Sequence, residues 1–298
     1  MSADDIVAPF GLDAAPVRGR IARLGAGALD PILRRHDYPR PIAMLLGEAL
    51  TLAALIASLL KVDGRLVVQA QGQGFVQLLV AEQGVRGRLR GYARMAPDAH
   101  EALAGAHRMA PADLLGEGQL AIILDHGEKE TAYQGVVALD GPTLAACAEN
   151  YFRSSEQTDT GIALAVGEVL SAHAPPLWRA GGVLMQRVAG DSSRGDTGED
   201  WTRASTLFAT VRDEELIDPD LSAATLLYRL FHEEGARLAA ATPLADGCTC
   251  DETRLTALMK QFPPAELCDL IEPDGLLHAK CQFCARSYRI DPGSVSAT

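Results

Sequence analysis

The cysteines constrain this 298-residue chain more than any other feature, because five of the six fall in the last 51 residues. Two close pairs stand out: Cys248-Thr249-Cys250 and, after thirty intervening residues, Cys281-Gln282-Phe283-Cys284. An extended backbone projects residues i and i+2 to the same side, and a tight C-x-x-C turn brings its two sulfurs together similarly. Two such pairs supply the four tetrahedral ligands of a structural zinc ion. The spacing predicts one zinc per chain, bound by Cys248, Cys250, Cys281 and Cys284.

The region that carries these pairs, 247–298, has few large apolar residues and needs a staple besides its core. Four thiolates leave no ligand position for a catalytic water, so a hydrolytic zinc enzyme is not expected. Structural zinc contributes on the order of 10–16 kcal/mol to the folding of such modules. Oxidation of the sulfurs to disulfides should therefore unfold the module. The pattern permits a redox switch but also fits a purely structural zinc.

Two other classes of protein use similar motifs. A thiol–disulfide oxidoreductase places C-x-x-C at the start of a helix, whereas 278–280 and 285–290 here predict a strand, a knuckle and a strand. A zinc-ribbon nucleic-acid binder needs a basic face. Region 247–298 has five Lys and Arg against seven Asp and Glu, and the whole chain has a net charge of −12. We therefore expect no nucleic-acid partner. Cys147 and Cys268 are expected to be packing residues rather than ligands.

The rest of the chain predicts an α+β fold, with a mixed helix and antiparallel-sheet domain at 1–180. Alternating residues at 65–71, 75–81 and 85–94 predict a meander, and 120–124 with 131–139 predict a hairpin around His126-Gly127. Helices are expected at 42–60 and 143–154. Segment 42–60 is long enough to span a bilayer, but Glu48 near its middle favours a buried core helix, so no membrane is expected. The N-terminal residues lack the pattern of a signal peptide, which predicts a cytoplasmic protein.

A linker region at 181–246 is expected between this domain and the zinc-binding redox-switch domain at 247–298. The Gly/Ser/Asp-rich stretch 191–200 reads as an exposed loop. Apolar residues then recur at helical spacing and predict two amphipathic helices. Their stripes contain, among others, Trp201, Phe208, Leu227, Leu230 and Phe231. The simplest interpretation is that both helices pack on the first domain.

Several motifs together resemble the heat-shock protein 33 family of redox-regulated holdase chaperones. The order and spacing of the four cysteines match the zinc centre of that family, with Tyr288 following. Further matches cover nearly the whole chain: Leu46-Gly47-Glu48, Lys61-Val62-Asp63-Gly64, Gln69–Gly74, Arg90–Arg94, the YFRSSEQ run Tyr151–Gln157, and the AGGVLMQ run Ala180–Gln186. Cys268 and the 191–200 stretch match no family feature. The polar groups of the Ser-Glu-Gln run are expected to satisfy local backbone, because no nucleophile with a base lies nearby.

The resemblance implies a mechanism and not an enzyme. The reduced, zinc-bound chaperone is largely inactive, and oxidants form the disulfides Cys248–Cys250 and Cys281–Cys284. Zinc is then lost, the C-terminal module unfolds and the middle region loosens. Apolar surface binds unfolding client proteins without ATP, and the active form is a homodimer. The stripe residues Trp201, Phe208, Leu227, Leu230 and Phe231 are the client-binding candidates.

Overall fold

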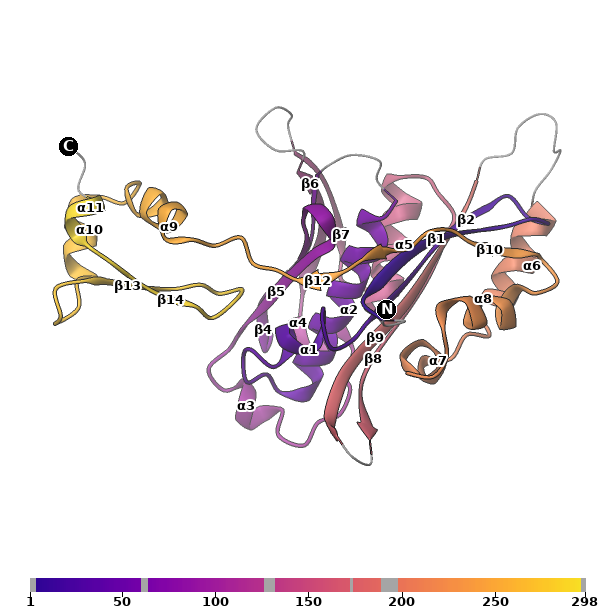
Figure 1. Ribbon diagram of the computed structural model, residues 1–298, viewed down its shortest axis with the longest axis horizontal. Helices are drawn as coiled ribbons and strands as arrows, with labels where there is room; N and C mark the ends of the chain where they lie inside the picture. Colours follow the sequence, from indigo (N-terminus) through magenta and orange to yellow (C-terminus); the bar gives the residue numbers. More distant parts are fainter. Residues whose placement is uncertain (1–3, 60–63, 126–131, 172–173, 189–197, 296–298) are drawn as a thin grey trace. The chain divides into compact units, whose positions relative to one another are not determined.

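The computed structural model describes residues 4–59, 64–125, 132–171, 174–188 and 198–295 (Figure 1). The chain forms two compact units, Met1–Asp246 and Gly247–Thr298, here called the N-terminal and C-terminal units. The N-terminal unit contains two mixed or antiparallel sheets, and the C-terminal unit contains a short hairpin with helices. The α+β prediction is confirmed.

Sheet B of the N-terminal unit has the strand order β12-β5-β4-β3-β6-β7. Its strands are β3 (Arg65–Gly72), β4 (Val76–Gln83), β5 (Arg88–Met95), β6 (Gly118–Asp125), β7 (Tyr133–Ala138) and β12 (Ala245–Asp246), with the 3-10 turn η1 (Val85–Gly87) before β5. The predicted meander and hairpin pairing are confirmed, because β3 pairs with β4, β4 with β5, and β6 with β7, all antiparallel. The turn expected at His126-Gly127 lies outside the described residues.

Sheet A has the order β10-β1-β2-β9-β8, and β11 also pairs with β1. Its strands are β1 (Ile6–Leu12), β2 (Val17–Leu24), β8 (Thr160–Ser171), β9 (Ala174–Arg187), β10 (Ala236–Leu238) and β11 (Thr242–Pro243). Strand β9 runs across residue 180, so the residues on both sides of that position share one sheet. Successive residues face opposite sides of a strand, and sheet A therefore contributes to two separate hydrophobic clusters.

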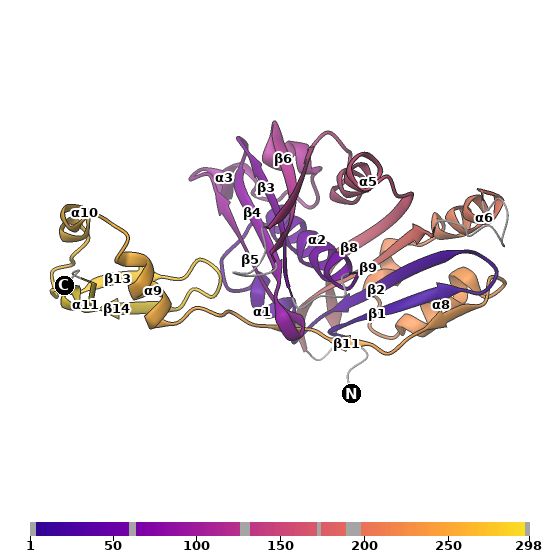
Figure 2. The ribbon, with the colours of Figure 1, turned by 90° about the horizontal axis from the view of Figure 1, so that it is seen from above.

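Helix α2 (Arg40–Ala57) lies between the two sheets and packs on strands of both (Figure 2). It is the one helix among the described residues that is long and apolar enough to cross a membrane, and 89% of that window is buried inside the fold. Glu48 on this helix is only 7% exposed and accepts a hydrogen bond from Arg108 Nη2 at 3.1 Å. The core helix expected at 42–60 is therefore observed, but it ends at Ala57, and Leu60 lies outside the described residues.

The described part of the N-terminal unit has four further α-helices before β8. They are α1 (Asp30–Leu33), α3 (Ala99–Ala102), α4 (Pro111–Leu115) and α5 (Leu144–Ser155). Helix α5 was predicted from the sequence, and Thr143 caps it by accepting a hydrogen bond from Ala146 N–H at 3.1 Å. Its buried residues include Tyr151 and Phe152 of the YFRSSEQ run.

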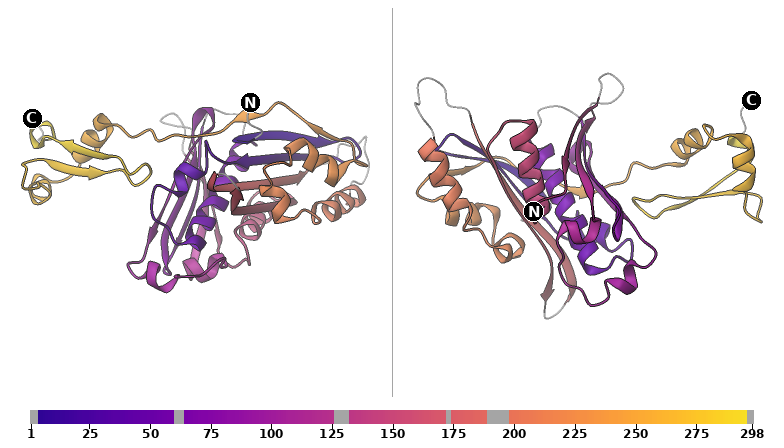
Figure 3. Two further views of the ribbon diagram at one scale, coloured as in Figure 1. Left: turned by 60° about the horizontal axis from the view of Figure 1, so that its bottom comes forward. Right: turned by 180° about the vertical axis from the view of Figure 1, so that it is seen from behind.

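The second face of sheet A is covered by α6 (Gly198–Phe208), α7 (Asp213–Ile217) and α8 (Ala223–Phe231), as Figure 3 shows. Two adjacent glycines of β9 allow both layers to approach. A Cβ on Gly181 would lie 2.0 Å from the backbone oxygen of Leu216 in α7, and one on Gly182 would lie 2.8 Å from Thr51 in α2. Neither position has room for a side chain, so the AGGVLMQ run fixes the spacing of three layers.

The C-terminal unit contains α9 (Glu252–Met259), α10 (Pro264–Asp269), β13 (Leu277–Lys280), β14 (Ser287–Ile290) and α11 (Pro292–Val295). Strands β13 and β14 pair antiparallel, from Leu277 opposite Ile290 to Lys280 opposite Ser287. The predicted strand, knuckle and strand are confirmed. The buried hydrophobic cluster of this unit has only four members among the described residues, Leu267, Leu277, Ile290 and Val295.

Candidate metal centre

The C-x-x-C pair occupies the turn between β13 and β14. Within the turn, Cys281 N–H donates to Arg286 O and Ala285 N–H donates to Cys281 O, both at 2.9 Å. Ala285 has a φ of +57°, in the left-handed region that usually favours glycine. This residue completes the reversal of the chain after Cys284. The two backbone bonds hold Cys281 and Cys284 on one compact knuckle.

The C-x-C pair lies on an irregular segment just before α9. Helix α9 begins after Asp251, whose side chain accepts a hydrogen bond from Arg254 N–H at 2.8 Å. This cap marks the end of the irregular segment directly after Cys250 and so helps to fix the backbone position of Cys250. Elements more than thirty residues apart in sequence therefore deliver the two pairs of thiols to one place.

The four thiols form one cluster. Their Sγ atoms all lie within 4.8 Å of one another, and the four residues are Cys248, Cys250, Cys281 and Cys284. The Sγ–Sγ distance is 3.7 Å between Cys248 and Cys281 and 3.2 Å between Cys250 and Cys284. Four sulfurs at about 2.3 Å from a tetrahedral ion lie about 3.8 Å apart. The cluster thus has nearly the dimensions of a four-thiolate site and could hold a metal ion.

Hydrogen bonds and burial act in opposite directions on the thiols. Burial raises the pKa of Cys250, but hydrogen bonds from Tyr288 and the neighbouring thiols outweigh it and lower that pKa to about 7. Burial is the main cause that raises the pKa of Cys284, to about 12. One thiolate therefore forms easily while its neighbour resists ionisation. A thiophilic cation in the cluster would stabilise all four thiolates.

Tyr288 ties β14 to the C-x-C segment. Its hydroxyl lies 3.1 Å from Cys250 Sγ and 3.2 Å from the carbonyl oxygen of Cys250, within hydrogen-bond reach of both. The sequence marked Tyr288 only as part of a family pattern, and its bond to Cys250 was not predicted. The hydroxyl orients one sulfur of the cluster from outside the four ligands.

The remaining chemical candidates lie outside the cluster. His278 bonds to Asp274 Oδ2 at 2.8 Å instead of joining the thiols. Cys147 is buried in α5, as expected of a packing residue. Cys268 is exposed, so the prediction that it is a packing residue is wrong.

The stripe residues of α6 and α8 are covered within the N-terminal unit. Phe208, Leu227, Leu230 and Phe231 are each at most 8% exposed, and Trp201 packs at the margin of the same cluster. Their neighbours are on sheet A, and the Phe231 ring stacks on Phe10 with centroids 6.1 Å apart. The packing expected as the simplest interpretation is what the structure shows.

Comparison with known proteins places these features in one family. A family profile described as "Hsp33 protein" matches residues 5–291. The chain is 48% identical over 290 residues to the 33 kDa chaperonin of Caulobacter vibrioides, covering 97% of this chain and 95% of the relative. It is 36% identical over 299 residues to the 33 kDa chaperonin of Pseudomonas aeruginosa, covering 99% and 95%.

A solved structure shows the same fold. The crystal structure of the 33 kDa chaperonin (heat shock protein 33 homolog) of Thermotoga maritima superposes with a TM-score of 0.77 at 21% identity, and covers 98% of this chain and 96% of that one. The match includes both units described here. On the strength of the family profile and the 48% identical relative, the chain belongs to the heat-shock protein 33 family of chaperones.

Proposed function

We propose that this chain is an ATP-independent holdase that oxidation of its four clustered cysteines activates. One observation carries the proposal. The thiol cluster belongs to a unit with only four buried hydrophobic residues among those described, so the state of the sulfurs decides whether that unit folds. Membership of a chaperone family supports the binding of unfolding client proteins.

In the reduced state, Cys248, Cys250, Cys281 and Cys284 would bind one zinc ion. When bound, the ion supplies the positive charge that holds four thiolates within 4.8 Å of one another. Zinc is the preferred ion because a closed tetrahedral four-thiolate set is typical of its structural sites. Tyr288 would keep Cys250 oriented toward the cluster.

Oxidation would pair Cys248 with Cys250 and Cys281 with Cys284. In each pair, two thiolates give up two electrons and join in a disulfide. An oxidant of the peroxide class takes up these electrons and two protons and leaves as two waters. Disulfide sulfurs are poor ligands, so the site loses its ion and the unit loses its main source of folding free energy.

Clients would then bind the apolar faces of α6 and α8, with Trp201, Phe208, Leu227, Leu230 and Phe231 as candidate contacts. These side chains pack on sheet A, so they become available only if the helices leave the sheet. Departure also uncovers residues of the sheet itself, such as Phe10 and Met185. The exposed surface would therefore have two halves, one on the helices and one on the sheet.

The domain division, the oligomeric state and the location of the protein are also proposed from the sequence. The functional division is 1–180 for the chaperone core, 181–246 for the linker region and 247–298 for the switch. The active form is a homodimer, and the protein works in the cytoplasm. The resemblance to the family supports the dimer.

The test is an aggregation-suppression assay on one sample, first reduced with zinc and then oxidised with peroxide. We expect suppression only after oxidation, together with the release of one zinc per chain, and the reverse on reduction. Limited proteolysis of the oxidised protein should cut first beyond about residue 230 and spare 1–180. Cys268→Ser is the matched control and should behave like the parent. Equal suppression in both states, or full zinc retention in Cys250→Ser, would contradict the switch.

A further inference from the structure

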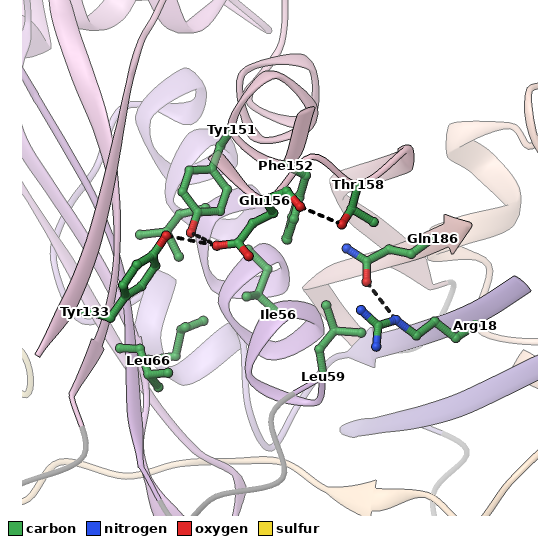
Figure 4. Close-up of a pocket in the computed structure, with 12 residues that line it drawn as sticks. Arg18, Ile56, Leu59, Leu66, Tyr133, Tyr151, Phe152, Glu156, Thr158 and Gln186 are labelled. Atoms are coloured by element: carbon green, nitrogen blue, oxygen red, sulfur yellow. Dashed lines mark hydrogen bonds between the residues drawn. The ribbon is translucent and has the colours of Figure 1, made fainter. Parts of the chain in front are cut away.

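A pocket in the N-terminal unit is lined by residues of sequence motifs that have no role in the proposed redox switch. It has a volume of about 370 Å³, near the lower end of the range for ligand sites. Figure 4 shows that its lining comes from the YFRSSEQ run after β7, from the end of the AGGVLMQ run in β9, and from Arg18 in β2. Two of the runs by which the sequence resembles this family therefore meet at one cavity.

The floor of the pocket is apolar. Ile56 and Leu59, at and just after the end of α2, contribute to it together with Leu66, Ile122, Leu124 and Phe152. The ring of Tyr151 can lie across β7 only because residue 135 is glycine, since a Cβ there would be 2.1 Å from the ring. The basin can take one large aliphatic or aromatic side chain.

A carboxylate stands at one rim. Glu156 Oε1 accepts hydrogen bonds from both tyrosines, at 2.9 Å from Tyr151 and 3.1 Å from Tyr133. Among the residues that the structure describes, no hydrogen bond to Oε2 is present, so that oxygen keeps its acceptor capacity. The two hydroxyls fix the carboxylate in place, as the dashed lines in Figure 4 show.

A guanidinium stands at the opposite rim. Arg18 Nε donates to Gln186 Oε1 at 3.0 Å, and Gln186, which is 2% exposed, is itself bonded through Nε2 to Thr160 at 3.2 Å. The two Nη atoms of Arg18 make no hydrogen bond within the described ranges of the chain. The buried amide of Gln186 thus orients the exposed guanidinium of Arg18 at the rim of the pocket and leaves its Nη donors available to a ligand.

A second hollow of about 400 Å³ adjoins the first at Arg18 and Thr158. Gln157, Asp159 and Val188 line it. Because Arg18 and Thr158 line both hollows, the order is a carboxylate acceptor, an apolar basin, a guanidinium donor and then a polar extension. An extended polypeptide fits this order better than a compact small molecule, because it repeats N–H donors, side chains and carbonyl acceptors along its length.

We propose that this pocket binds an extended segment of an unfolded polypeptide. A large apolar side chain fills the basin, Arg18 donates to a main-chain carbonyl of the segment and Glu156 accepts from a main-chain N–H. The site is separate from the faces of α6 and α8 and rests on the chaperone function of the family rather than on the redox switch.

The test uses the full chain, both reduced with zinc and oxidised, and a short fluorescein-labelled peptide with a single central leucine. Fluorescence anisotropy should show saturable binding in at least one of the two states. Replacement of the leucine by serine should weaken that binding at least about tenfold. Arg18→Met and Glu156→Gln should each weaken it about three- to tenfold, since each removes a charge-assisted hydrogen bond. Arg153→Met on α5 and Glu101→Gln on α3 are matched controls at exposed positions outside the pocket and should bind like the parent.

A photo-crosslinkable residue in place of the leucine should label the pocket floor around Leu59 or Leu66. Failure of the leucine peptide to bind in either state, indifference to both pocket variants, or crosslinks on α8 alone would overturn the proposal. Zinc content and its release by peroxide are measured on the same variants and should match the parent. If the pocket variants bind the peptide like the parent while peroxide still releases zinc, only the pocket proposal is refuted. If the pocket variants weaken peptide binding but peroxide releases no zinc, only the switch is refuted.

Discussion

The two units of this chain differ in how many hydrophobic side chains they bury. The N-terminal unit buries a continuous core around α2 and a second cluster between sheet A and helices α6 to α8. The C-terminal unit buries four hydrophobic side chains among its described residues and gathers four thiols instead. Apolar burial persists under oxidising conditions, whereas thiolate ligation does not. A single chain thereby combines a chemically indifferent part with a chemically sensitive one.

The largest effect should come from removing the metal ligands. Cys250→Ser, or chelation of the reduced protein, should unfold the C-terminal unit, because structural zinc contributes on the order of 10–16 kcal/mol in such modules. Hydrogen exchange would show it as loss of protection at Leu277–Lys280 with unchanged protection in β3. Protection that survives in β13 would mean that the small core suffices, and the contrast between the units would fail.

The next effect tests apolar burial in the N-terminal unit. Phe231→Ala removes a side chain that is 0% exposed and stacked on Phe10, and should cost about 3–5 kcal/mol of unfolding free energy in that unit. Urea titration followed by tryptophan fluorescence measures this, since Trp178 and Trp201 both lie there. Tyr228→Ala on the same helix is the control, because Tyr228 is 67% exposed, and should change stability by less than about 0.5 kcal/mol. Zinc content should be unchanged in both variants.

A third effect concerns pH. Burial in α2, only partly offset by Arg108, raises the pKa of Glu48 from its ordinary 4.5 to about 7. Between pH 4.5 and 7 the folded state binds more protons than the unfolded state. The free energy of unfolding therefore falls as pH rises through that window, by up to about 3 kcal/mol from this group. Above pH 7 this group adds no further pH dependence. Glu48→Gln should remove this slope and leave the N-terminal unit more stable than the parent at pH 8. Glu101→Gln should retain the parent's slope, and identical slopes in all three proteins would rule out a raised pKa at Glu48.

The smallest effect lies in the knuckle. Ala285 adopts a φ of +57°, so Ala285→Gly should relieve strain and stabilise the C-terminal unit by about 0.5–1 kcal/mol. Competition with a chromophoric chelator should show a zinc affinity about two- to fivefold higher. Ala279→Gly, within β13, should have the opposite sign because glycine weakens a strand.

Sequence patterns predicted the elements whose periodicity is local. Helix α2, the meander of sheet B and the hairpin around the knuckle followed from alternation, helical spacing and turn residues, and the clustering of the thiols followed from C-x-C and C-x-x-C. The strands of sheet A were not predicted. Strand β2 reads VRGRIARL, and β9 contains Gly181-Gly182, which weaken a strand pattern. Those glycines serve contacts with α7 and α2, which only the tertiary structure reveals.

The site divides in the same way. Residue type and spacing were enough to choose four cysteines, because ligand chemistry is local. The hydrogen bond between the Tyr288 hydroxyl and Cys250 and the positive φ of Ala285 depend on how the hairpin closes, and no sequence pattern predicts either of them. The side chain of Glu156 was expected to satisfy local backbone at a helix end, but it accepts hydrogen bonds from Tyr151 of the same helix and from Tyr133 of β7, and the second partner lies on a separate element that local spacing does not reveal.

The segment Ala236–Asp246 closes one edge of each sheet. Strands β10 and β11 lie along β1, and β12 lies along β5, so without them β1 and β5 would be outermost. Outermost strands present unpaired backbone groups that recruit strands of other chains. If loosening after α8 extended through this segment, both sheets would gain a free border at once. Self-association through main-chain pairing would then compete with any other use of the exposed surface, and its rate would rise with protein concentration.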